Sequence, residues 1–300
     1  MKRANYYLAA IASFVIWGFI SFSLKPLHIY PSLDLLFFRI FFSAGIISLF
    51  TFFIRPKNFL VQRSIFKKLS TLEKRKTVIL TLVGGLLLTA NWFFYIYVMN
   101  TVSIKTAAFA YLVCPILTTV LAGIVIKERL TKIQWIAVGI SAVSCTILGM
   151  HSAVELGYSM IVALSYALYL ISQRKNIYID KMVILTFQML SSALLLAPFF
   201  PFFSSQVNYE TSFYLQIIVL AIVFTILPLF LNLYALKEVN SSTMGILLYV
   251  NPLLSFVIAM LYFDEKISAI QLMSYTFILF SILVFNWKII STFIRKEKAH

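Results

Sequence analysis

The sequence predicts an all-α polytopic membrane protein with ten transmembrane helices in two inverted five-helix repeats. Three observations predict this fold: the composition, ten apolar segments and an internal repeat. Of the 300 residues, 61% are hydrophobic and 12% are charged, whereas a soluble domain carries about 25% charged residues. So few charges cannot cover a water-facing surface, and we therefore take the bilayer as the solvent of this fold.

Ten segments of about 20 apolar residues have the length that crosses a bilayer. The first apolar segment is too long for the core of a signal peptide, so we expect it to stay in the protein as a span. The longest polar connection runs from Arg55 to Lys76, which leaves no room for a soluble domain between spans. We place the spans at residues 6–24, 33–54, 77–99, 103–125, 131–150, 156–173, 182–203, 212–236, 240–262 and 267–287.

Lysine and arginine collect in alternate loops, which sets the orientation by the positive-inside rule. The loops on the other side, which are poor in basic residues, hold only Lys25, Lys105 and Lys266. We expect the basic loops and both termini in the cytoplasm and the chain in the plasma (inner) membrane. The net charge of +15 is then a signal of topology first and of attraction to anionic lipids second, and not of nucleic-acid binding. The basic loops lie at residues 55–76, 127–132, 174–181, 237 and 288–298.

A pattern in residues 91–134 recurs about 137 residues later without a gap, which is the signature of a duplication. A weaker match at the start of each half sets Trp17, Lys25 and Arg39 opposite Tyr166, Arg174 and Gln188 at one common offset. Tyr97 matches Tyr234, and the matches that an apolar composition does not explain are Pro115 with Pro252, Glu128 with Glu265, and Gln134 with Gln271.

Five spans in each half is an odd number, so the two halves must insert in opposite directions. We place the repeats at residues 1–150 and 151–300, with a short outside hinge at His151–Glu155. Inverted repeats that enclose a central site are the architecture of alternating-access carriers.

Four stretches resemble the RarD group of the EamA-type drug/metabolite transporter superfamily: FFRIFFS in span two, NWFFYIYVMN in span three, AYLVCP with ERLTKIQWIAV, and TMGILLYVNP in span nine. The resemblance covers nearly the whole chain in the right order. It implies a ten-helix carrier with a central cavity and a small organic substrate. The chain departs from the group at Phe38, where RarD relatives usually show His, and at Gln188, where they typically show Glu.

Arg39 lies about two turns inside span two, where a charge costs at least ~2.5–3.5 kcal/mol at the bilayer centre and less near the interface. No Asp or Glu lies in the middle of a predicted span, so Arg39 has no obvious carboxylate partner. We interpret Arg39 as a cavity-facing group that binds a substrate carboxylate or phosphate with its planar fork. The alternatives are snorkelling to the outer interface and bonds to Asp34 or helix carbonyls.

Span three carries a polar and aromatic face formed by Asn91, Trp92 and Tyr95 at helical spacing. These side chains are candidates to stack on a substrate and to hydrogen-bond with it. The alternative is that they hold helices together, since amides bond across spans. Trp17 is a further candidate, which with Lys25 lines the outer mouth or anchors the interface.

Two prolines interrupt spans four and nine, and a tyrosine precedes each: Tyr111 before Pro115 and Tyr249 before Pro252. Each proline removes an intrahelical bond, so we expect matched kinks that free carbonyls toward a cavity, unless the kinks serve packing alone. Asn251 joins the cavity candidates.

Gln188 is a further cavity candidate, on span seven. Glu128 and Glu265 lie at span ends beside Arg129 and Lys266, and we interpret them as ion pairs that anchor loops.

The sequence predicts no enzyme, cofactor or metal site, because it contains no HExxH, G-x-S-x-G or Walker A motif. We predict secondary transport, as a permease or exporter, of a small organic metabolite or drug-like compound that is anionic or zwitterionic. The expected partners are this substrate and the lipid bilayer. An integral-membrane enzyme or lipid-handling factor that uses the same buried arginine is the alternative.

Overall fold

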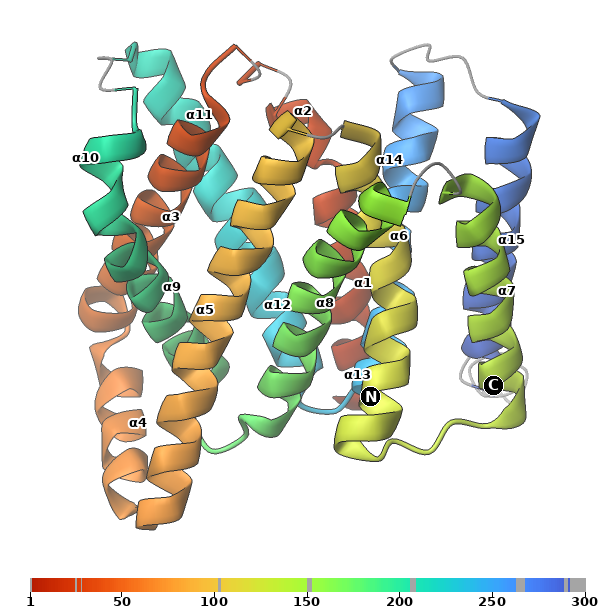
Figure 1. The fold of residues 1–300 in the computed structure, drawn as a ribbon. Helices are drawn as coiled ribbons and strands as arrows, with labels where there is room; N and C mark the ends of the chain where they lie inside the picture. Colours follow the sequence, from red (N-terminus) through yellow and green to blue (C-terminus); the bar gives the residue numbers. More distant parts are fainter. Residues whose placement is uncertain are drawn as a thin grey trace, which may run out of the picture.

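The structure is a computed structural model that describes residues 2–24, 26–27, 29–101, 104–149, 153–205, 209–262, 268–288 and 291 (Figure 1). The described residues form helices and no strand, which confirms the predicted all-α class. The first half contains α1 (Lys2–Gly18), α2 (Ile20–Leu24), α3 (Ser32–Leu49), the π-helix η1 (Phe50–Ile54), α4 (Pro56–Lys68), α5 (Thr71–Thr101), α6 (Ile104–Leu121), the π-helix η2 (Ala122–Ile126) and α7 (Lys132–Gly149).

The second half begins with α8 (Ala153–Lys175), and the predicted hinge residues His151 and Ser152 lie outside the described residues. The other elements are α9 (Lys181–Leu196), the 3₁₀-helix η3 (Ala197–Phe199), α10 (Phe200–Phe203), α11 (Thr211–Ala221), the π-helix η4 (Ile222–Ile226), α12 (Leu227–Ala235), α13 (Ser241–Leu247), α14 (Val250–Leu261) and α15 (Ala269–Phe285).

Within the described residues, eight helical segments are long and apolar enough to cross a membrane, so the chain is a polytopic membrane protein. The predicted fifth and tenth spans correspond to two apolar helices that are shorter, Lys132–Leu148 and Ala269–Phe285. Large apolar side chains such as Leu194, Phe202 and Phe53 are exposed on the outside of the bundle, as lipid-facing side chains are. The eight segments are Ala4–Leu24, Ser32–Ile54, Thr71–Val98, Phe109–Ile126, Leu156–Lys175, Lys181–Phe203, Thr211–Ala235 and Ser241–Ile258.

The connection from Arg55 to Lys76 is helical, and its prediction as a loop was wrong. Pro56 stands at the first position of α4, where its missing N–H costs nothing. Ser70 and Glu73 then cap α5 reciprocally: Ser70 N donates to Glu73 Oε2 at 2.9 Å and Glu73 N donates to Ser70 Oγ at 3.3 Å. These local signals start α5 before the apolar part of the span.

Two ends of the bundle are distinguished by charge. The basic end carries α4, the end of α8 with Arg174, and the connections that contain Lys127 and Lys237, and it is the lower end in Figure 1. The opposite end carries α2, α10 and the start of α11. Helix α1 runs away from the basic end whereas α8 runs toward it, so these two helices are antiparallel (Figure 1).

The helices of the two halves pack in a reciprocal pattern. Helix α1 packs against α12 and α14 of the second half, while α8 packs against α5 and α6 of the first half. Helix α3 packs against α9, α6 against α13, and α7 against α15. The largest core cluster lies among α1, α3, α5, α8, α9 and α12, and therefore joins the halves.

The glutamines of the internal repeat have the same structural task. Gln134 accepts a bond from Thr131 N at 2.9 Å at the start of α7. Gln271 accepts one from Ser268 N at 2.9 Å at the start of α15, where Ser268 and Gln271 form a capping box. The repeat thus preserves a helix start at corresponding places.

Candidate substrate site

The site is built around the main-chain carbonyl of Phe224, in the π-helix η4. In a regular helix this carbonyl would accept the N–H of residue 228, but that residue is Pro228, which has no N–H. Thr225 bonds back along the helix, with Oγ1 donating to Leu220 O at 2.9 Å. The π-helix and the proline together present the Phe224 carbonyl and the Thr225 hydroxyl to side chains from α1 and α3.

Arg39, on α3, binds both of these groups. Its Nε donates to Thr225 Oγ1 at 2.7 Å and its Nη2 donates to Phe224 O at 3.2 Å. No described residue is a hydrogen-bond partner of Nη1. One edge of the guanidinium is therefore fixed, while the Nη1 donors make no hydrogen bond to a described residue.

Two tryptophans hold the guanidinium in place. Trp17 Nε1 donates to the same Phe224 carbonyl at 3.0 Å. The ring of Trp92 lies against the guanidinium, with 4.7 Å from Arg39 Cζ to the ring centroid. A cation over an aromatic face is stabilised without being neutralised.

Tyr95 and Tyr111 complete the aromatic surround. Their ring centroids are 5.4 Å apart, and both side chains lie close enough to Arg39 to interact with its charge. The structure thus brings five predicted site residues together: Arg39, Trp17, Trp92, Tyr95 and Tyr111.

Asp34 is not the partner of Arg39. Its carboxylate is buried and accepts from Ser205 N at 3.2 Å, and also from the hydroxyls of Ser205 and Tyr209. Burial, and next the bond to Asp34, raise the pKa of Tyr209, so its hydroxyl remains a donor at neutral pH. The alternative in which Asp34 pairs with Arg39 is wrong, while the alternative of a bond to a helix carbonyl is met at Phe224.

Asn91 is 1% exposed and holds two helices together. Its Nδ2 donates to Val162 O at 2.9 Å and to Ser165 Oγ at 3.2 Å, both on α8. Its Oδ1 accepts from Tyr111 OH at 3.3 Å. Both the nitrogen and the oxygen of the Asn91 amide take part in these bonds. Asn91 therefore helps to position the Tyr111 hydroxyl and has no unbonded amide atom for a substrate.

Gln188 is fully buried on α9, where its Oε1 accepts from Tyr169 OH at 3.5 Å. Its Nε2 lies against α5, so close to Gly84 that a Cβ there would be 2.3 Å away. Tyr249 is also fully buried, beside Cys145 in a separate cluster of α6, α7, α13 and α15. Tyr249 therefore lies in a different cluster from Arg39, and none of its described contacts is with Arg39.

Asn251 lies at the contact between α14 and α1. Its Oδ1 accepts from Ser255 Oγ at 3.5 Å, and Ser255 Oγ also lies 3.3 Å from Gly18 O. A Cβ at Gly18 would stand 2.7 Å from the Cβ of Leu254. The two helices approach closely here, and Asn251 belongs to that contact.

The two repeat prolines lie in different helical surroundings, and the expected matched kinks stay a prediction. Pro252 follows a break between α13 and α14, where Tyr249 N bonds to Ile246 O at 3.2 Å and Asn251 N to Leu248 O at 3.1 Å. Pro115 lies inside the continuous helix α6. Only the second proline interrupts its helix.

Glu128 does not anchor its loop through Arg129. Its carboxylate accepts from Ser241 N at 2.9 Å and Ser242 N at 3.0 Å, and so caps α13 of the other half. The interpretation as an ion pair with Arg129 was wrong, because the first N–H groups of a helix attract a carboxylate. Glu265 and Lys266 lie outside the described residues.

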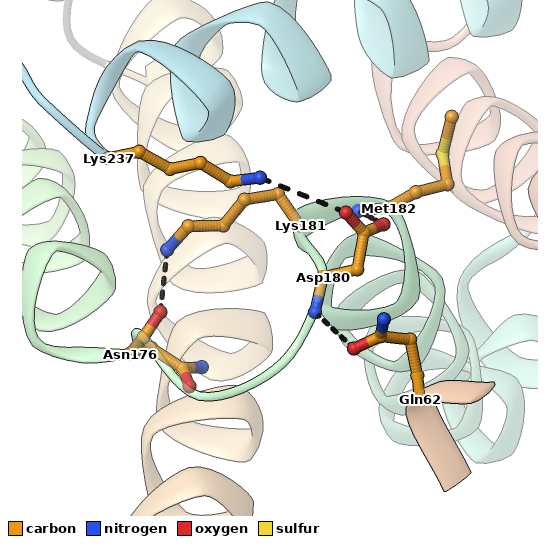
Figure 2. Close-up of polar contacts among 6 residues, drawn as sticks. All are labelled: Gln62, Asn176, Asp180, Lys181, Met182 and Lys237. Carbon is orange, nitrogen blue, oxygen red and sulfur yellow. Dashed lines mark hydrogen bonds and ion pairs between the residues drawn. The ribbon is translucent and has the colours of Figure 1, made fainter. Parts of the chain in front are cut away.

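Figure 2 shows a further group of polar contacts at the basic end, around the α8–α9 connection. Asp180 N donates to Gln62 Oε1 at 3.0 Å, and the Asp180 carboxylate is 3.8 Å from Lys237 Nζ. Lys181 is 2% exposed and donates to Asn176 O at 2.6 Å and Gln173 O at 3.2 Å. Its charge lies on the last carbonyls of α8, where a cation is favoured.

Comparison with known proteins agrees with this architecture. The EamA-like transporter family matches the chain over residues 4–150 and 155–287. The chain belongs to the EamA-like transporter family. It is therefore a membrane transporter and not an enzyme.

Relatives of this EamA-family chain span nearly its full length. The uncharacterized transporter YojE of Bacillus subtilis is 26% identical and covers 100% of this chain and 98% of its own. Protein RarD of Escherichia coli is 26% identical, with 97% of each chain covered, so the resemblance to the RarD group is confirmed. A solved crystal structure shares the fold with a TM-score of 0.75 at 18% identity, covering 95% of this chain and 98% of its own.

Two parts of the EamA-family site were missed from the sequence. A main-chain carbonyl has no residue signature, but Pro228 indicates which carbonyl of the span is free. Asn232 and Tyr166 are fully or almost fully buried near the tryptophans. Tyr166 appeared only as the repeat counterpart of Trp17, and that match was the available signal.

Proposed function

We propose that this transporter is a secondary carrier of a small organic anion or zwitterion, either a metabolite or a drug-like compound. The observation that carries the proposal is Arg39: its guanidinium is inside the bundle, fixed along one edge, stacked on Trp92 and without a carboxylate partner among the described residues. A charge held this way inside a membrane protein is typical of a substrate or ion site. A carboxylate or phosphate would take the remaining Nη1 donor.

The mechanism we propose is alternating access between two inverted five-helix repeats, residues 1–150 and 151–300. The reciprocal packing supports it, because the first span of each half packs against the third and fourth spans of the other half. The antiparallel course of α1 and α8 also supports it (Figure 1), as do the two matched ranges of the family. In such carriers one repeat moves against the other around a central site.

We place the chain in the plasma (inner) membrane with both termini cytoplasmic. The charge asymmetry supports this orientation, because the basic end holds most of the lysines and arginines. The substrate would then meet Arg39 from the outer side when the opposite end opens, and from the cytoplasm when the basic end opens.

The test is counterflow in proteoliposomes that contain the purified protein. Vesicles are loaded with a metabolite mixture, and the uptake of isotopically labelled organic anions, zwitterions and cations is compared with that of protein-free vesicles. We expect exchange of at least one organic anion or zwitterion, and loss of that exchange in Arg39→Gln. If cations alone exchange, or if Arg39→Gln exchanges as well as wild type, the proposed role of Arg39 is wrong.

A further inference from the structure

Two tyrosine–amide pairs lie side by side in the core, next to the Arg39 site. Asn232 Nδ2, on α12, is 3.4 Å from the hydroxyl of Tyr166, and Tyr169 OH is 3.5 Å from Gln188 Oε1. The two tyrosine rings, both on α8, are 5.8 Å apart. Asn232, Tyr169 and Gln188 are 0% exposed and Tyr166 is 4% exposed. The four side chains form one buried neutral cluster, which we call the amide cluster.

Each amide in this cluster has one atom without a partner. Asn232 Oδ1 and Gln188 Nε2 are buried and have no hydrogen bond in the part of the chain that the structure describes. Unpaired buried polar atoms are costly and therefore rare, so two in one cluster call for a ligand or a function.

The amide cluster is continuous with the Arg39 site. The ring of Tyr166 is 6.0 Å from that of Trp17, whose Nε1 shares the Phe224 carbonyl with Arg39. Asn232 follows Thr225, the other Arg39 partner, by about two helical turns, or roughly 10 Å along the axis. A ligand on Arg39 that extends toward the basic end would therefore meet Asn232.

The internal repeat relates the two sites. The offset that pairs Trp17 with Tyr166 also pairs Arg39 with Gln188. Arg39 lies against η4, in the third span of the other half, and Gln188 lies against α5, the third span of the first half. The amide cluster is thus the counterpart of the Arg39 site in the second half, with a neutral amide where the first half has a cation.

We propose that the amide cluster is a second substrate subsite, which binds an uncharged amide or hydroxyl end of the same organic anion whose charge Arg39 binds. This inference rests on the proposed transport function and narrows its substrate class. Asn232 Oδ1 accepts a hydrogen bond and Gln188 Nε2 donates one, which suits a group that can do both. The cluster contains no carboxylate to receive a cationic end, so it favours anions with a neutral polar end over zwitterions.

A pair of matched substitutions separates a ligand group from a structural amide. Asn91 and Asn232 are both buried, but Asn91 uses both amide atoms in bonds and Asn232 does not. In ligand-free protein in detergent, Asn91→Leu should lower the melting temperature by several degrees. Asn232→Leu should lower it less, because the loss of the 3.4 Å bond to Tyr166 OH is offset by the removal of an unpaired polar atom. A fall for Asn232→Leu as large as that for Asn91→Leu would make Asn232 a packing residue and overturn the subsite.

Binding is then measured with two anions that differ in the neutral end, 6-acetamidohexanoate and hexanoate, by the change in tryptophan fluorescence. Wild type should bind 6-acetamidohexanoate about tenfold more tightly. Asn232→Leu and Gln188→Leu should abolish this preference, whereas Arg39→Gln should weaken the binding of both anions.

Equal binding of the two anions by wild type, or binding of neither, overturns the subsite and this substrate class. The proposed transport function fails by a different result, which is the absence of any exchange in the metabolite counterflow screen. The two failures are therefore distinguishable.

Discussion

Arg39 donates a hydrogen bond to the carbonyl of Phe224 at 3.2 Å, and this is the carbonyl that Pro228 leaves without its helical partner. The side-chain charge and the proline come from different halves of the chain. The site is therefore shared between the two halves of the chain, and a movement of one half against the other would change how Arg39 is held.

Pro228→Ala tests this relationship. Alanine restores an N–H that can bond to Phe224 O, so it competes with Arg39 and Trp17 for the carbonyl. We expect about five- to tenfold weaker substrate affinity, which corresponds to about 1 kcal/mol for one bond, with unchanged or higher thermal stability. Counterflow in proteoliposomes and thermal melts measure the two effects.

The matched control for this prediction is Pro115→Ala. Pro115 lies in the continuous helix α6, and none of its described contacts is with Arg39, so affinity should change less. Equal affinity in wild type and Pro228→Ala would show that the freed carbonyl does not matter for binding.

Substitution of Arg39 should give graded losses. Arg39→Lys keeps the charge but loses the planar fork, and Arg39→Gln loses both. A lost charged hydrogen bond costs roughly 1.5–3 kcal/mol, or about ten- to hundredfold in affinity. We expect the larger loss for Gln, with both variants still inserted, as measured by binding and by folded yield.

The control is Asp34→Asn, because Asp34 bonds to Ser205 and Tyr209 and not to Arg39. Asp34→Asn should reduce the intrinsic affinity of the Arg39 site for the substrate less than Arg39→Gln does. Identical losses in Asp34→Asn and Arg39→Gln would instead place both residues in one structural network.

Cysteine labelling of intact cells tests the orientation. Ser212 is exposed at the opposite end and Lys68 is exposed at the basic end, while the native Cys114 and Cys145 are buried and give little background. An impermeant thiol reagent added outside should label Ser212→Cys. It should label Lys68→Cys only after the membrane is opened. The reverse pattern would overturn the orientation.

The sequence predicted the parts of this molecule that depend on side-chain type and spacing. The low charge and the long apolar segments of the chain reflect the lipid that surrounds the helices, and they predicted the all-α membrane fold. An uncompensated cation in an apolar span is equally visible, so Arg39 was found, as were the aromatic residues Trp17, Trp92, Tyr95 and Tyr111 that now surround it.

The parts that could not be predicted depend on the main chain and on distant contacts. Asn91 and Asn232 are both amides in apolar spans, and only their partners distinguish a helix–helix bond from an unpaired atom. Glu128 has Arg129 as its neighbour in sequence, but its partners are N–H groups of Ser241 and Ser242. The helix α4 was missed because its packing face is only half-buried and carries few apolar residues, such as Phe59 and Phe66, in a stretch rich in basic residues.

Asp34 and Glu128 suggest how the two ends are held closed. Asp34, at the opposite end, accepts bonds from Ser205 and Tyr209. Glu128, at the basic end, accepts bonds from Ser241 and Ser242. Each carboxylate belongs to the first half and its partners to the second, so opening either end must break the contact there. Neutral Asn or Gln accepts these bonds less strongly than a carboxylate.

We therefore expect Asp34→Asn to favour opening at the opposite end and Glu128→Gln to favour opening at the basic end. Loss of charged bonds worth roughly 1.5–3 kcal/mol is enough to shift a two-state equilibrium by about ten- to hundredfold. Spin labels at Ile29 and Ser212 report the opposite end, and labels at Arg129 and Glu238 report the basic end; all four residues are exposed. Double electron–electron resonance should show a longer distance at the opposite end alone in Asp34→Asn, and at the basic end alone in Glu128→Gln. If each substitution lengthens both distances, or neither, the two carboxylates do not act as separate closures, since an alternating carrier opens one end at a time.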